Sequence, residues 1–288
     1  MAETLKLKRH ETFSIREGWI EKAINYVYEN PFCFRKDDGP KILGMGTNMV
    51  KSLHYWVTAS NLVQFHINTG ATLTECGSLI YEFDQYLTNK FTWWIIHYNL
   101  STNFNDAPVI NKIFNSDLNK FEKDFLTNSI LNVLEKDYEI KSLGSLESDV
   151  QIYLKSYFSS DKSNPENNFN CPLSKLNLLD MVSKNVYEKE MPNTNDLDFR
   201  IVYRCLLDCM DIDGGNLSRA HFNVEDLYDK DNNPLKIFNL SKSALFYYLD
   251  VLKQKGYISL HKTAGLNTIY IEKYMSLRAM FEGYFRED

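Results

Sequence analysis

The sequence has no long apolar run and contains little glycine or proline. Its richest apolar run, residues 93–96, is followed at once by His97 and soon by Asn99, so no stretch of about 18 apolar residues is available to cross a membrane. The 12 glycines and 7 prolines exclude a collagen-like or linker-dominated chain. Residues 1–16 carry charges throughout and lack the apolar segment of a secretory signal. We therefore expect a cytoplasmic protein with no membrane partner.

Cysteine is scarce, and its spacing does not suit a metal site. The five residues are Cys33, Cys76, Cys171, Cys205 and Cys209. An odd number of widely separated cysteines, without a CxxC pair, indicates reduced thiols in a cytosol. Cys205 and Cys209 are four residues apart in an apolar stretch, which favours two core residues on one helix face. A zinc site would need two further ligands, and His221 is the only nearby candidate. We expect no bound metal.

Motifs of the common hydrolases and nucleotide-binding enzymes are also missing. His10-Glu11 is not followed by a second histidine at the spacing of a zinc protease. Gly44-Met45-Gly46 lacks the third glycine and the preceding long strand of a dinucleotide-binding loop. No GxSxG or phosphate-binding loop occurs. We therefore predict a protein that is not an enzyme, with no catalytic residues and no cofactor.

The cluster of His10, Glu11 and Arg16 invites a catalytic interpretation, but no second acid, base or metal ligand lies at a set spacing from it. We predict a structural role instead. Thr12 or Ser14 is positioned to cap the first helix, and Glu11 to satisfy backbone donors at its start. Arg16 is expected to reach an acid or a carbonyl on a neighbouring hairpin.

The rest of the composition is that of a folded protein of about two domains. Hydrophobic residues make up 44% and charged residues 24%, and the net charge is 32 − 38 = −6. Polar segments interrupt the chain at residues 159–170, 191–198 and 229–234. We expect an N-terminal winged-helix-like unit at residues 1–90, a helical middle at 91–180 and a C-terminal winged-helix unit at 181–288. In the middle region, Ser145 or Ser148 is positioned to cap a helix.

Both ends of the chain have the pattern of a helix followed by a hairpin. In the N-terminal copy, Thr47 is positioned to cap a helix with one apolar face: Val50, Leu53 and Val57. Residues 64–67 and 71–74 then form two short β-like runs around a glycine turn, and Thr74 can cap the next helix.

In the C-terminal copy, Ser241 is positioned to cap a helix that ends near Gly256. Its apolar face has strict helical spacing: Leu245, Tyr248, Leu249 and Leu252. Residues 257–262 and 266–271 form the two β-like runs, with a turn at 263–265. This order of elements is that of a winged helix-turn-helix. We predict a mainly α (α+β) fold in which two winged helix-turn-helix units flank a helical middle.

The C-terminal copy carries most of the candidate DNA-binding residues. Residues 241–278 contain six Lys or Arg and two Asp or Glu, so their charge is 6 − 2 = +4. A basic segment in an acidic chain is typical of a localised nucleic-acid site. The expected contacts are Ser241, Lys242, Ser243, Tyr247 and Lys253 on the helix, and His261, Lys262 and Asn267 on the hairpin. A solvated helix face in a protein-binding domain would have the same pattern.

The N-terminal copy offers a second set. Asn48, Lys51, Ser52 and Tyr55 are the candidates on its helix, and Arg9 belongs to a basic arm that could lie along phosphates. A flexible, solubilising N-terminus is an equal alternative. The many aromatic residues could stack on unpaired bases, but most stand at helical core spacing, which favours packing.

Several separated motifs resemble a bacterial family known as domain of unknown function 4007, over nearly the whole chain. The motifs are Arg9-His10-Glu11-Thr12-Phe13, Arg16-Glu17-Gly18-Trp19, Gly44-Met45-Gly46-Thr47-Asn48-Met49-Val50-Lys51-Ser52, Tyr55-Trp56, Leu73-Thr74 with Gly77, Trp94 with His97-Tyr98, Asp149-Val150 with Tyr157, and Cys171-Pro172-Leu173. Cys171 stands where the family pattern has a small residue such as Ser. Thr47 stands where it has Lys, which removes one charge able to reach a phosphate.

The resemblance implies an accessory protein of DNA-modification and phage-defence gene clusters, which often also encode sulfur-transfer proteins. With the basic segment, it leads us to predict a non-enzymatic, DNA-binding component of a DNA-modification (phosphorothioation-like) or anti-phage system, whose partner is double-stranded DNA. One alternative is an adaptor that docks a sulfur-transfer or nuclease partner without binding DNA. Another is an enzyme with an unrecognised site. The sequence leaves a homodimer open.

Overall fold

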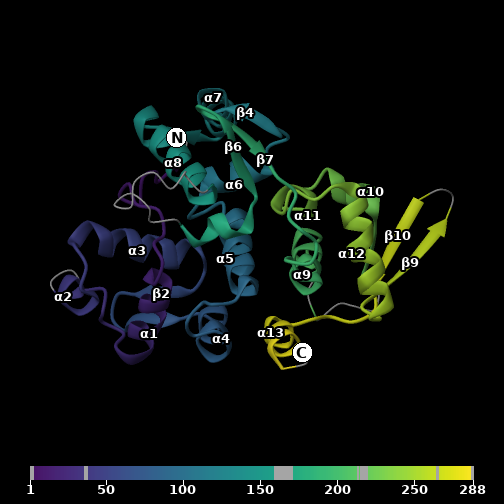
Figure 1. The fold of residues 1–288 in the computed structure, drawn as a ribbon, viewed down its shortest axis with the longest axis horizontal. Coiled ribbons are helices and arrows are strands. Elements are labelled where there is room, and N and C mark those ends of the chain that lie inside the picture. Colours follow the sequence, from purple (N-terminus) through teal and green to yellow (C-terminus); the bar gives the residue numbers. More distant parts are fainter. Residues whose placement is uncertain are drawn as a thin grey trace. The chain divides into compact units, whose positions relative to one another are not determined.

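The computed structural model describes residues 3–35, 38–158, 171–212, 214, 220–263 and 266–286. Helices dominate and the β-sheets are small, so the predicted α+β class is confirmed (Figure 1). The chain forms two compact units, Met1–Glu190 (unit 1) and Met191–Asp288 (unit 2), and each is described by itself. The expected linker at residues 159–170 lies outside the described residues.

Unit 1 consists of helices interspersed with short strands. Its helices are α1 (Trp19–Glu29), α2 (Gly39–Leu43), α3 (Thr47–Ala59), α4 (Glu75–Phe83), α5 (Lys90–Thr102), α6 (Pro108–Asn115), α7 (Lys123–Leu134), α8 (Leu143–Tyr157) and the 3₁₀ helix η2 (Pro172–Leu176). Its strands are β1 (Glu3–Thr4), β2 (Val63–His66), β3 (Gly70–Leu73), β4 (Lys120–Glu122), β5 (Tyr138–Glu139), β6 (Leu179–Ser183) and β7 (Val186–Lys189).

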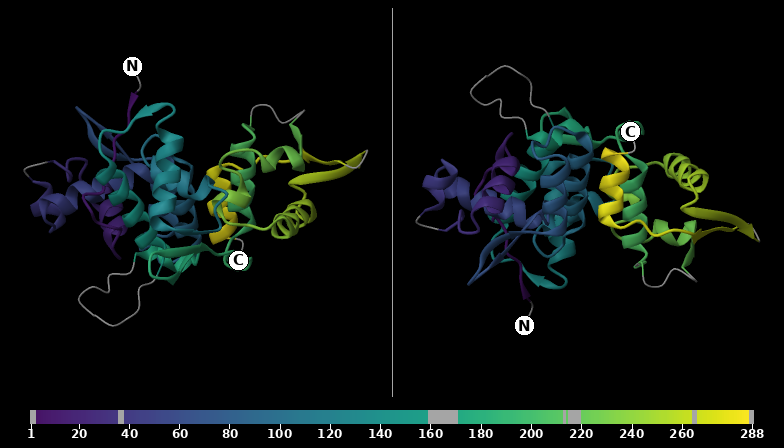
Figure 2. Two further views of the ribbon diagram at one scale, coloured as in Figure 1. Left: turned by 90° about the horizontal axis from the view of Figure 1, so that it is seen from above. Right: turned by 90° about the horizontal axis from the view of Figure 1, so that it is seen from below.

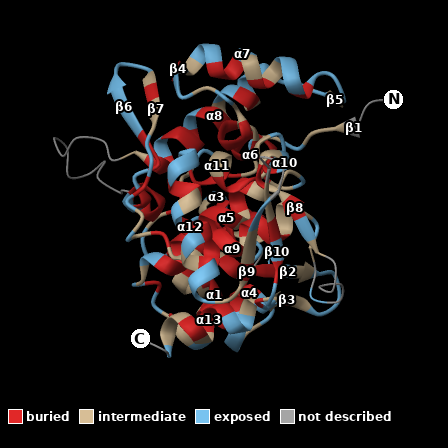
Figure 3. Cartoon of the chain, turned by 90° about the vertical axis from the view of Figure 1, so that its right-hand side faces the viewer, coloured by how far each residue is buried: buried red, intermediate tan, exposed pale blue. Residues whose placement is uncertain are grey.

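Helix α5 is the centre of the unit 1 core. It is buried on nearly every side, because α6 and η2 pack against it, and it is coloured mostly as buried in Figure 3. The amide of Asn99 donates to the carbonyl of Ser60 (2.8 Å), and the amide of Asn103 donates to the carbonyl of Ala59 (3.0 Å). These bonds join α5 to the end of α3. The N-terminal and middle regions, which the sequence separates near residue 90, therefore lie within one compact unit.

The small sheets of unit 1 are mostly antiparallel. Strands β2 and β3 pair with Val63 opposite Leu73 and His66 opposite Gly70, which confirms the first predicted hairpin. Gly70 has a φ of +82°, a backbone conformation that residues other than glycine rarely adopt. The other sheets are a three-stranded one, in the order β4-β7-β6, and the short parallel pair β1-β5.

The residues that cap the helices of unit 1 agree with the sequence prediction at one position and differ from it at others. The hydroxyl of Thr74 accepts a hydrogen bond from the Gly77 N–H (3.0 Å), as predicted for the start of α4. The predicted cap by Thr47 is wrong, because Gly46 holds the extended conformation of a cap residue and Thr47 is already helical. Likewise Ser142, and neither Ser145 nor Ser148, caps α8.

Unit 2 combines helices with one antiparallel sheet. Its elements are α9 (Phe199–Cys209), β8 (His221–Asn223), α10 (Val224–Tyr228), α11 (Pro234–Ile237), α12 (Lys242–Gln254), β9 (Ile258–Thr263), β10 (Leu266–Ile271) and α13 (Leu277–Phe285). The strand order is β8-β10-β9, with Ile269 opposite both Phe222 and Leu260. Strands β9 and β10 extend beyond the helices of the unit (Figure 2). Of the turn predicted at residues 263–265, residues 264 and 265 lie outside the described residues.

The buried face of α12 holds unit 2 together. Its four predicted core residues, Leu245, Tyr248, Leu249 and Leu252, are all buried, and α12 packs on α9 and β9. The hydroxyl of Tyr248 donates to the carbonyl of Leu197 (2.9 Å), and that of Tyr203 donates to the carbonyl of Lys273 (2.6 Å). Gly256 has a φ of +73°, which confirms its predicted place at the end of the helix.

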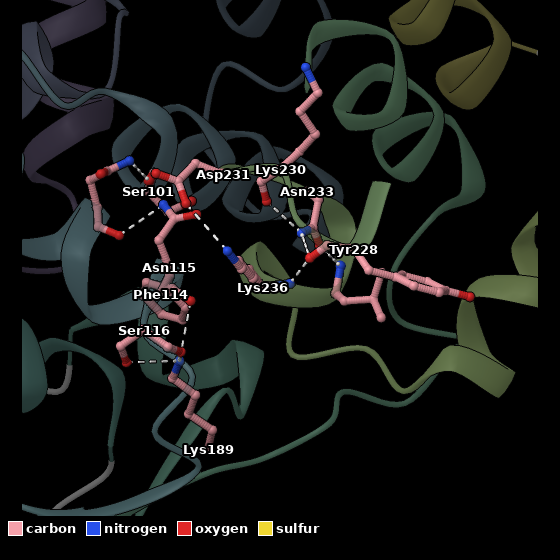
Figure 4. A network of polar contacts seen from close by, with 12 residues as sticks. Ser101, Phe114, Asn115, Ser116, Lys189, Tyr228, Lys230, Asp231, Asn233 and Lys236 are labelled. Atoms are coloured by element: carbon pink, nitrogen blue, oxygen red, sulfur yellow. Dashed lines mark hydrogen bonds and ion pairs between the residues drawn. The ribbon is translucent and has the colours of Figure 1, made fainter. Parts of the chain in front are cut away.

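Each unit also contains a polar side chain that ties loops to helix ends (Figure 4). In unit 1, the ammonium of Lys189 donates to the carbonyls of Phe114 (3.2 Å) and Ser116 (2.7 Å), which fastens β7 to the end of α6. In unit 2, the buried amide of Asn233 donates to the carbonyl of Lys230 (2.7 Å), and its oxygen accepts from N–H groups at the start of α11. Such bonds satisfy backbone groups that helices leave unpaired at their ends.

The described residues contain no disulfide. Cys205 is buried in α9 and Cys209 is half-buried near its end, as expected of core residues on one helix. Burial raises the pKa of the Cys76 and Cys171 thiols to about 12, so both are protonated at neutral pH. Within the described part of the chain, no helix is long and apolar enough to span a membrane.

Candidate nucleic-acid interface

The start of α12 presents polar side chains around a completed helix cap. The hydroxyl of Ser241 accepts a hydrogen bond from the Ala244 N–H (3.1 Å), as predicted. Ser241 also shares a hydrogen bond with the hydroxyl of the exposed Ser243 (2.9 Å). The exposed Lys242 places its ammonium 4.1 Å from the ring centroid of Tyr228 on α10, a cation–π contact. The ring therefore holds this lysine at the first turn of the helix.

The outward face of α12 continues with Tyr247, Asp250 and Lys253, all exposed. Tyr247 leaves 49% of its surface exposed, which is high for a large aromatic side chain, and packs edge-on against the buried Tyr248. Asp250 is the one acid among residues 241–254, and it has no ion pair among the described residues. Lys242 and Lys253 lie roughly 16 Å apart along the helix axis, at 1.5 Å per residue.

The strand register divides the predicted hairpin residues between two faces. Lys262 and Asn267 are paired directly opposite each other. They lie on the same face of the sheet as the buried Ile269, two residues further along the strands toward residues 264–265. His261 lies on the other face. Its ring packs edge-on against Tyr270 (5.1 Å between centroids), which in turn stacks on His221 of β8 (5.3 Å).

This aromatic row was not predicted. Tyr270 is 40% exposed. For His221, the sequence suggests only a place as a zinc ligand beside Cys205 and Cys209. Within the part of the chain that the structure describes, no group of three or more His, Cys, Asp or Glu side chains could hold a metal ion. The alternation of residues in β10 predicts the outward position of Tyr270, but the pairing with β8 depends on the tertiary structure.

The N-terminal set is only partly exposed. Asn48 and Lys51 face solvent on α3, and the Lys51 ammonium donates to the Asn48 side-chain oxygen (3.3 Å). The predictions for Ser52 and Tyr55 are wrong, because both are buried. Helix α3 is covered on most of its circumference by α1, α2 and β2, and one stripe remains at the surface. The guanidinium of Arg9 is committed to an ion pair with Asp106 (2.7 Å).

The segment that begins at Arg9 is an anchor rather than a reactive site. His10 is fully buried, and its Nδ1 accepts a hydrogen bond from the Thr12 N–H (3.1 Å). Its Nε2 therefore carries the proton and donates to the buried carboxylate of Asp149 on α8 (2.6 Å). A second bond to Asp149 comes from the backbone N–H of Lys8 (2.9 Å). Both ring nitrogens are occupied, so His10 has none left for a substrate.

The predicted capping roles in this segment are wrong. Helix α1 begins at Trp19 after Gly18, which has a φ of +76°, and no side chain caps it. Glu11 lies instead near Lys51, with 3.9 Å between the charged groups, and the Arg16 guanidinium lies 5.5 Å from the ring of Trp19. The chain turns sharply before the helix, since Glu11 and Thr12 both have positive φ. Folding, not sequence spacing, sets these contacts.

Burial shifts the pKa values of several groups around this anchor. It raises the pKa of Asp149 above its usual value, although the hydrogen bond from His10 opposes the shift. Burial also raises the pKa of Tyr55, which shares a hydrogen bond with Tyr153. His54, a half-buried residue next to the exposed stripe of α3, has its pKa lowered to about 4 by burial and by the nearby positive charge of Arg9, so its ring is neutral at pH 7.

Motif residues far apart in the sequence meet in this unit. The indole N–H of Trp56 donates to the carbonyl of Phe13 (3.0 Å), and the ring of His97 shares a hydrogen bond with the hydroxyl of Tyr157 (2.7 Å). A Cβ on Gly77 would lie 2.1 Å from the carbonyl oxygen of Leu62, so only glycine fits there. The motifs therefore specify packing.

Comparison with protein families gives a match over nearly the whole chain. A family model described as a protein of unknown function (DUF4007) matches residues 7–285. The chain belongs to this family. The membership that the motifs suggested is thus confirmed. No curated protein matches this DUF4007 protein.

Solved structures with the same fold include two of SspB. One, described as "SspB crystal structure", has a TM-score of 0.84 and 23% identity, over 99% of this chain and 89% of the other. The second, "Magnesium ion-bound SspB crystal structure", has a TM-score of 0.80 and 24% identity, over 94% and 84%. At this identity the likeness shows the fold alone. The described residues of the DUF4007 protein contain no cluster of ligands suited to such an ion, and we assign no magnesium site.

Proposed function

We propose that this DUF4007 protein is a non-enzymatic, DNA-binding component of a bacterial DNA-modification or anti-phage system. In this proposal unit 2 is a winged helix-turn-helix. Helices α11 and α12 form the helix-turn-helix, β9 and β10 form the wing, and α12 enters the major groove. The genomic context implied by the family resemblance, in which sulfur-transfer proteins occur, supports a role in modification or defence.

The observation that carries the proposal is the exposed face of α12. A recognition helix needs polar or basic side chains at its N-terminal end and along one side, held by a rigid scaffold. Helix α12 offers Lys242, Ser243 and Tyr247 there, while its opposite face is buried in the core. Lys242 and Lys253 are spaced widely enough to meet phosphates on both sides of a major groove about 12 Å wide.

Unit 1 supports a second, smaller contact. The order α1, α2, α3 and the β2-β3 hairpin is again that of a winged helix-turn-helix, but burial leaves Asn48 and Lys51 as its exposed candidates. Arg9 is paired with Asp106, so a phosphate would have to compete with that carboxylate. We therefore assign the main duplex contact to unit 2.

The adaptor function has one observation in its favour. Helix α7 leaves Phe125 60% exposed and Val133 43% exposed, and the neighbouring Leu143 is 46% exposed. Contiguous exposed apolar patches are typical of protein interfaces, and these three side chains supply apolar surface for one. Docking of a sulfur-transfer or nuclease partner on α7 is compatible with DNA binding through α12. It becomes the main function if the chain does not bind DNA.

Electrophoretic mobility shift with a duplex oligonucleotide, over a range of salt concentrations, tests the proposal. We expect binding that weakens steeply with salt, and weaker binding still by the double variant Lys242→Glu/Lys253→Glu. If the folded wild-type chain does not bind the duplex, the DNA-binding proposal is refuted and the adaptor function becomes the proposed one. Supercoiled plasmid is incubated in parallel with and without magnesium. Sustained cleavage that one point mutation abolishes would contradict the non-enzymatic part of the proposal.

A further inference from the structure

Unit 1 contains a cavity beside the exposed stripe of α3. Its volume is about 290 Å³, near the lower end of the range for small-molecule sites. Among the described residues it is lined by Phe34, Pro40, Thr47, Val50, Lys51 and His54. Its lining includes residues of both α2 and α3, which pack against each other. Its walls are aromatic and aliphatic, with a few polar groups, as is usual in sites for small molecules.

His54 is the polar group within the aromatic wall. Its ring stacks on Phe65 (3.7 Å between centroids) and packs edge-on against Phe34 (5.8 Å). Neither ring nitrogen has a hydrogen-bond partner among the described residues. A neutral imidazole has one donor and one acceptor, and its low pKa keeps this ring neutral at pH 7. The ring is thus fixed in place with its hydrogen-bonding capacity unused.

A positive region adjoins this wall. Helix α3 starts without a side-chain cap at Thr47, which lines the cavity, so its first N–H groups and the positive end of its dipole lie near the rim. Lys51 lies one turn further on. Its ammonium is 3.9 Å from the carboxylate of Glu11 and 3.3 Å from the side-chain oxygen of Asn48, and it remains half-exposed. An anion at the rim would meet the ammonium and the helix start together.

We propose that this cavity binds one nucleotide. The base lies against Phe34 and hydrogen-bonds to His54, and the phosphate lies between Lys51 and the start of α3. This inference concerns a different unit from the main duplex contact on α12, although Lys51 is also a candidate for the smaller contact of unit 1. Its choice of a nucleic-acid ligand rests on the proposed function. A base pair does not fit a cavity of about 290 Å³. The nucleotide is therefore free or belongs to an unpaired position of a strand, as in proteins that bind unstacked bases.

Isothermal titration of the full chain with the four deoxynucleoside 5′-monophosphates, and with single-stranded octanucleotides, tests this inference. We expect saturable binding of at least one probe. Lys51→Gln should weaken it about tenfold, because a charge-assisted phosphate contact is lost. The matched control Lys41→Gln removes an exposed charge on α2 outside the cavity and should leave affinity unchanged.

Two further variants address the base. His54→Phe keeps the stacked ring but removes both nitrogens, so it should change the preference among the four bases. Thr47→Trp places a large side chain at an exposed position of the rim and should abolish binding. Thermal melts show that each variant is folded. Binding of mononucleotides identifies a free ligand, whereas binding of octanucleotides alone identifies a strand; either supports the site.

The inference is overturned if the wild type binds no probe, or if Thr47→Trp and His54→Phe bind like wild type. Duplex binding is measured on the same preparations. Its loss in Lys242→Glu/Lys253→Glu with unchanged nucleotide binding would separate the two sites. Duplex binding without nucleotide binding refutes the cavity site alone. Nucleotide binding without duplex binding refutes the proposed function alone.

Discussion

Removing the two lysines at the ends of α12 is the most direct probe of the duplex contact. The double variant Lys242→Gln/Lys253→Gln leaves the buried face of the helix and the Ser241 cap intact. The variant also loses the cation–π contact between Lys242 and the ring of Tyr228, which contributes about 0.5–1 kcal/mol to stability at an exposed site. The fold should therefore survive with a slightly lower melting temperature.

The expected change in affinity comes from the counterions that each phosphate contact releases. Each lysine contributes about 0.9 to the slope of log K against log salt concentration. A fourfold rise in salt, from 50 to 200 mM, thus weakens binding by about 3.5-fold per contact and about 12-fold for two. The wild type should lose about 12-fold more affinity than the double variant over this range, because the variant no longer makes these two contacts.

Fluorescence anisotropy with a labelled 20-base-pair duplex at five salt concentrations measures both slopes. The matched control is Lys136→Gln/Lys141→Gln, which removes the same charge from exposed positions of unit 1. The control should bind with the wild-type slope. If the α12 variant and the control have the same slope, the effect is one of net charge, and α12 is not the contact surface.

Three further predictions address other parts of the molecule. Asp250→Asn should raise duplex affinity several-fold at 50 mM salt and little at 500 mM, because it removes the repulsion between this carboxylate and the DNA phosphates, which salt screens. Unchanged affinity at low salt would contradict the proposed orientation of α12. The pKa of His54 is about 4 when folded and about 6.5 when unfolded, so the free energy of unfolding that the neutral ring contributes is lost as pH falls through this window. In urea unfolding, the free energy of unfolding of the wild type should therefore fall by about 2 kcal/mol more than that of His54→Phe between pH 7 and pH 5. His10→Ala should lower the free energy of unfolding by about 3–5 kcal/mol, because it leaves the buried carboxylate of Asp149 without its partner, whereas Glu11→Ala should lower it by less than about 1 kcal/mol. Equal decreases in the melting temperatures of the two variants would contradict the role of His10 as an anchor.

The sequence alone determined the features that depend on local periodicity and on turn chemistry. The apolar spacing of residues 245–252, the cap at Ser241 and the glycine after α12 predicted that helix and its buried face correctly, because all three act within a few residues. The cap at Thr74 and the β2-β3 hairpin follow for the same reason. The separated motifs likewise identified the family.

Only the tertiary structure decided which polar side chains remain at the surface. Ser52 has the polarity of a contact residue, yet packing on α3 buries it, and no local pattern contains that information. The role of His10 depends on Asp149, more than a hundred residues away, and the place of Glu11 near Lys51 depends on a turn with positive φ. The cavity beside His54 arises in the same way, since its walls come from α2, α3 and the segment before them. Burial is a property of neighbours brought together by folding, and a sequence gives each residue's chemistry without those neighbours.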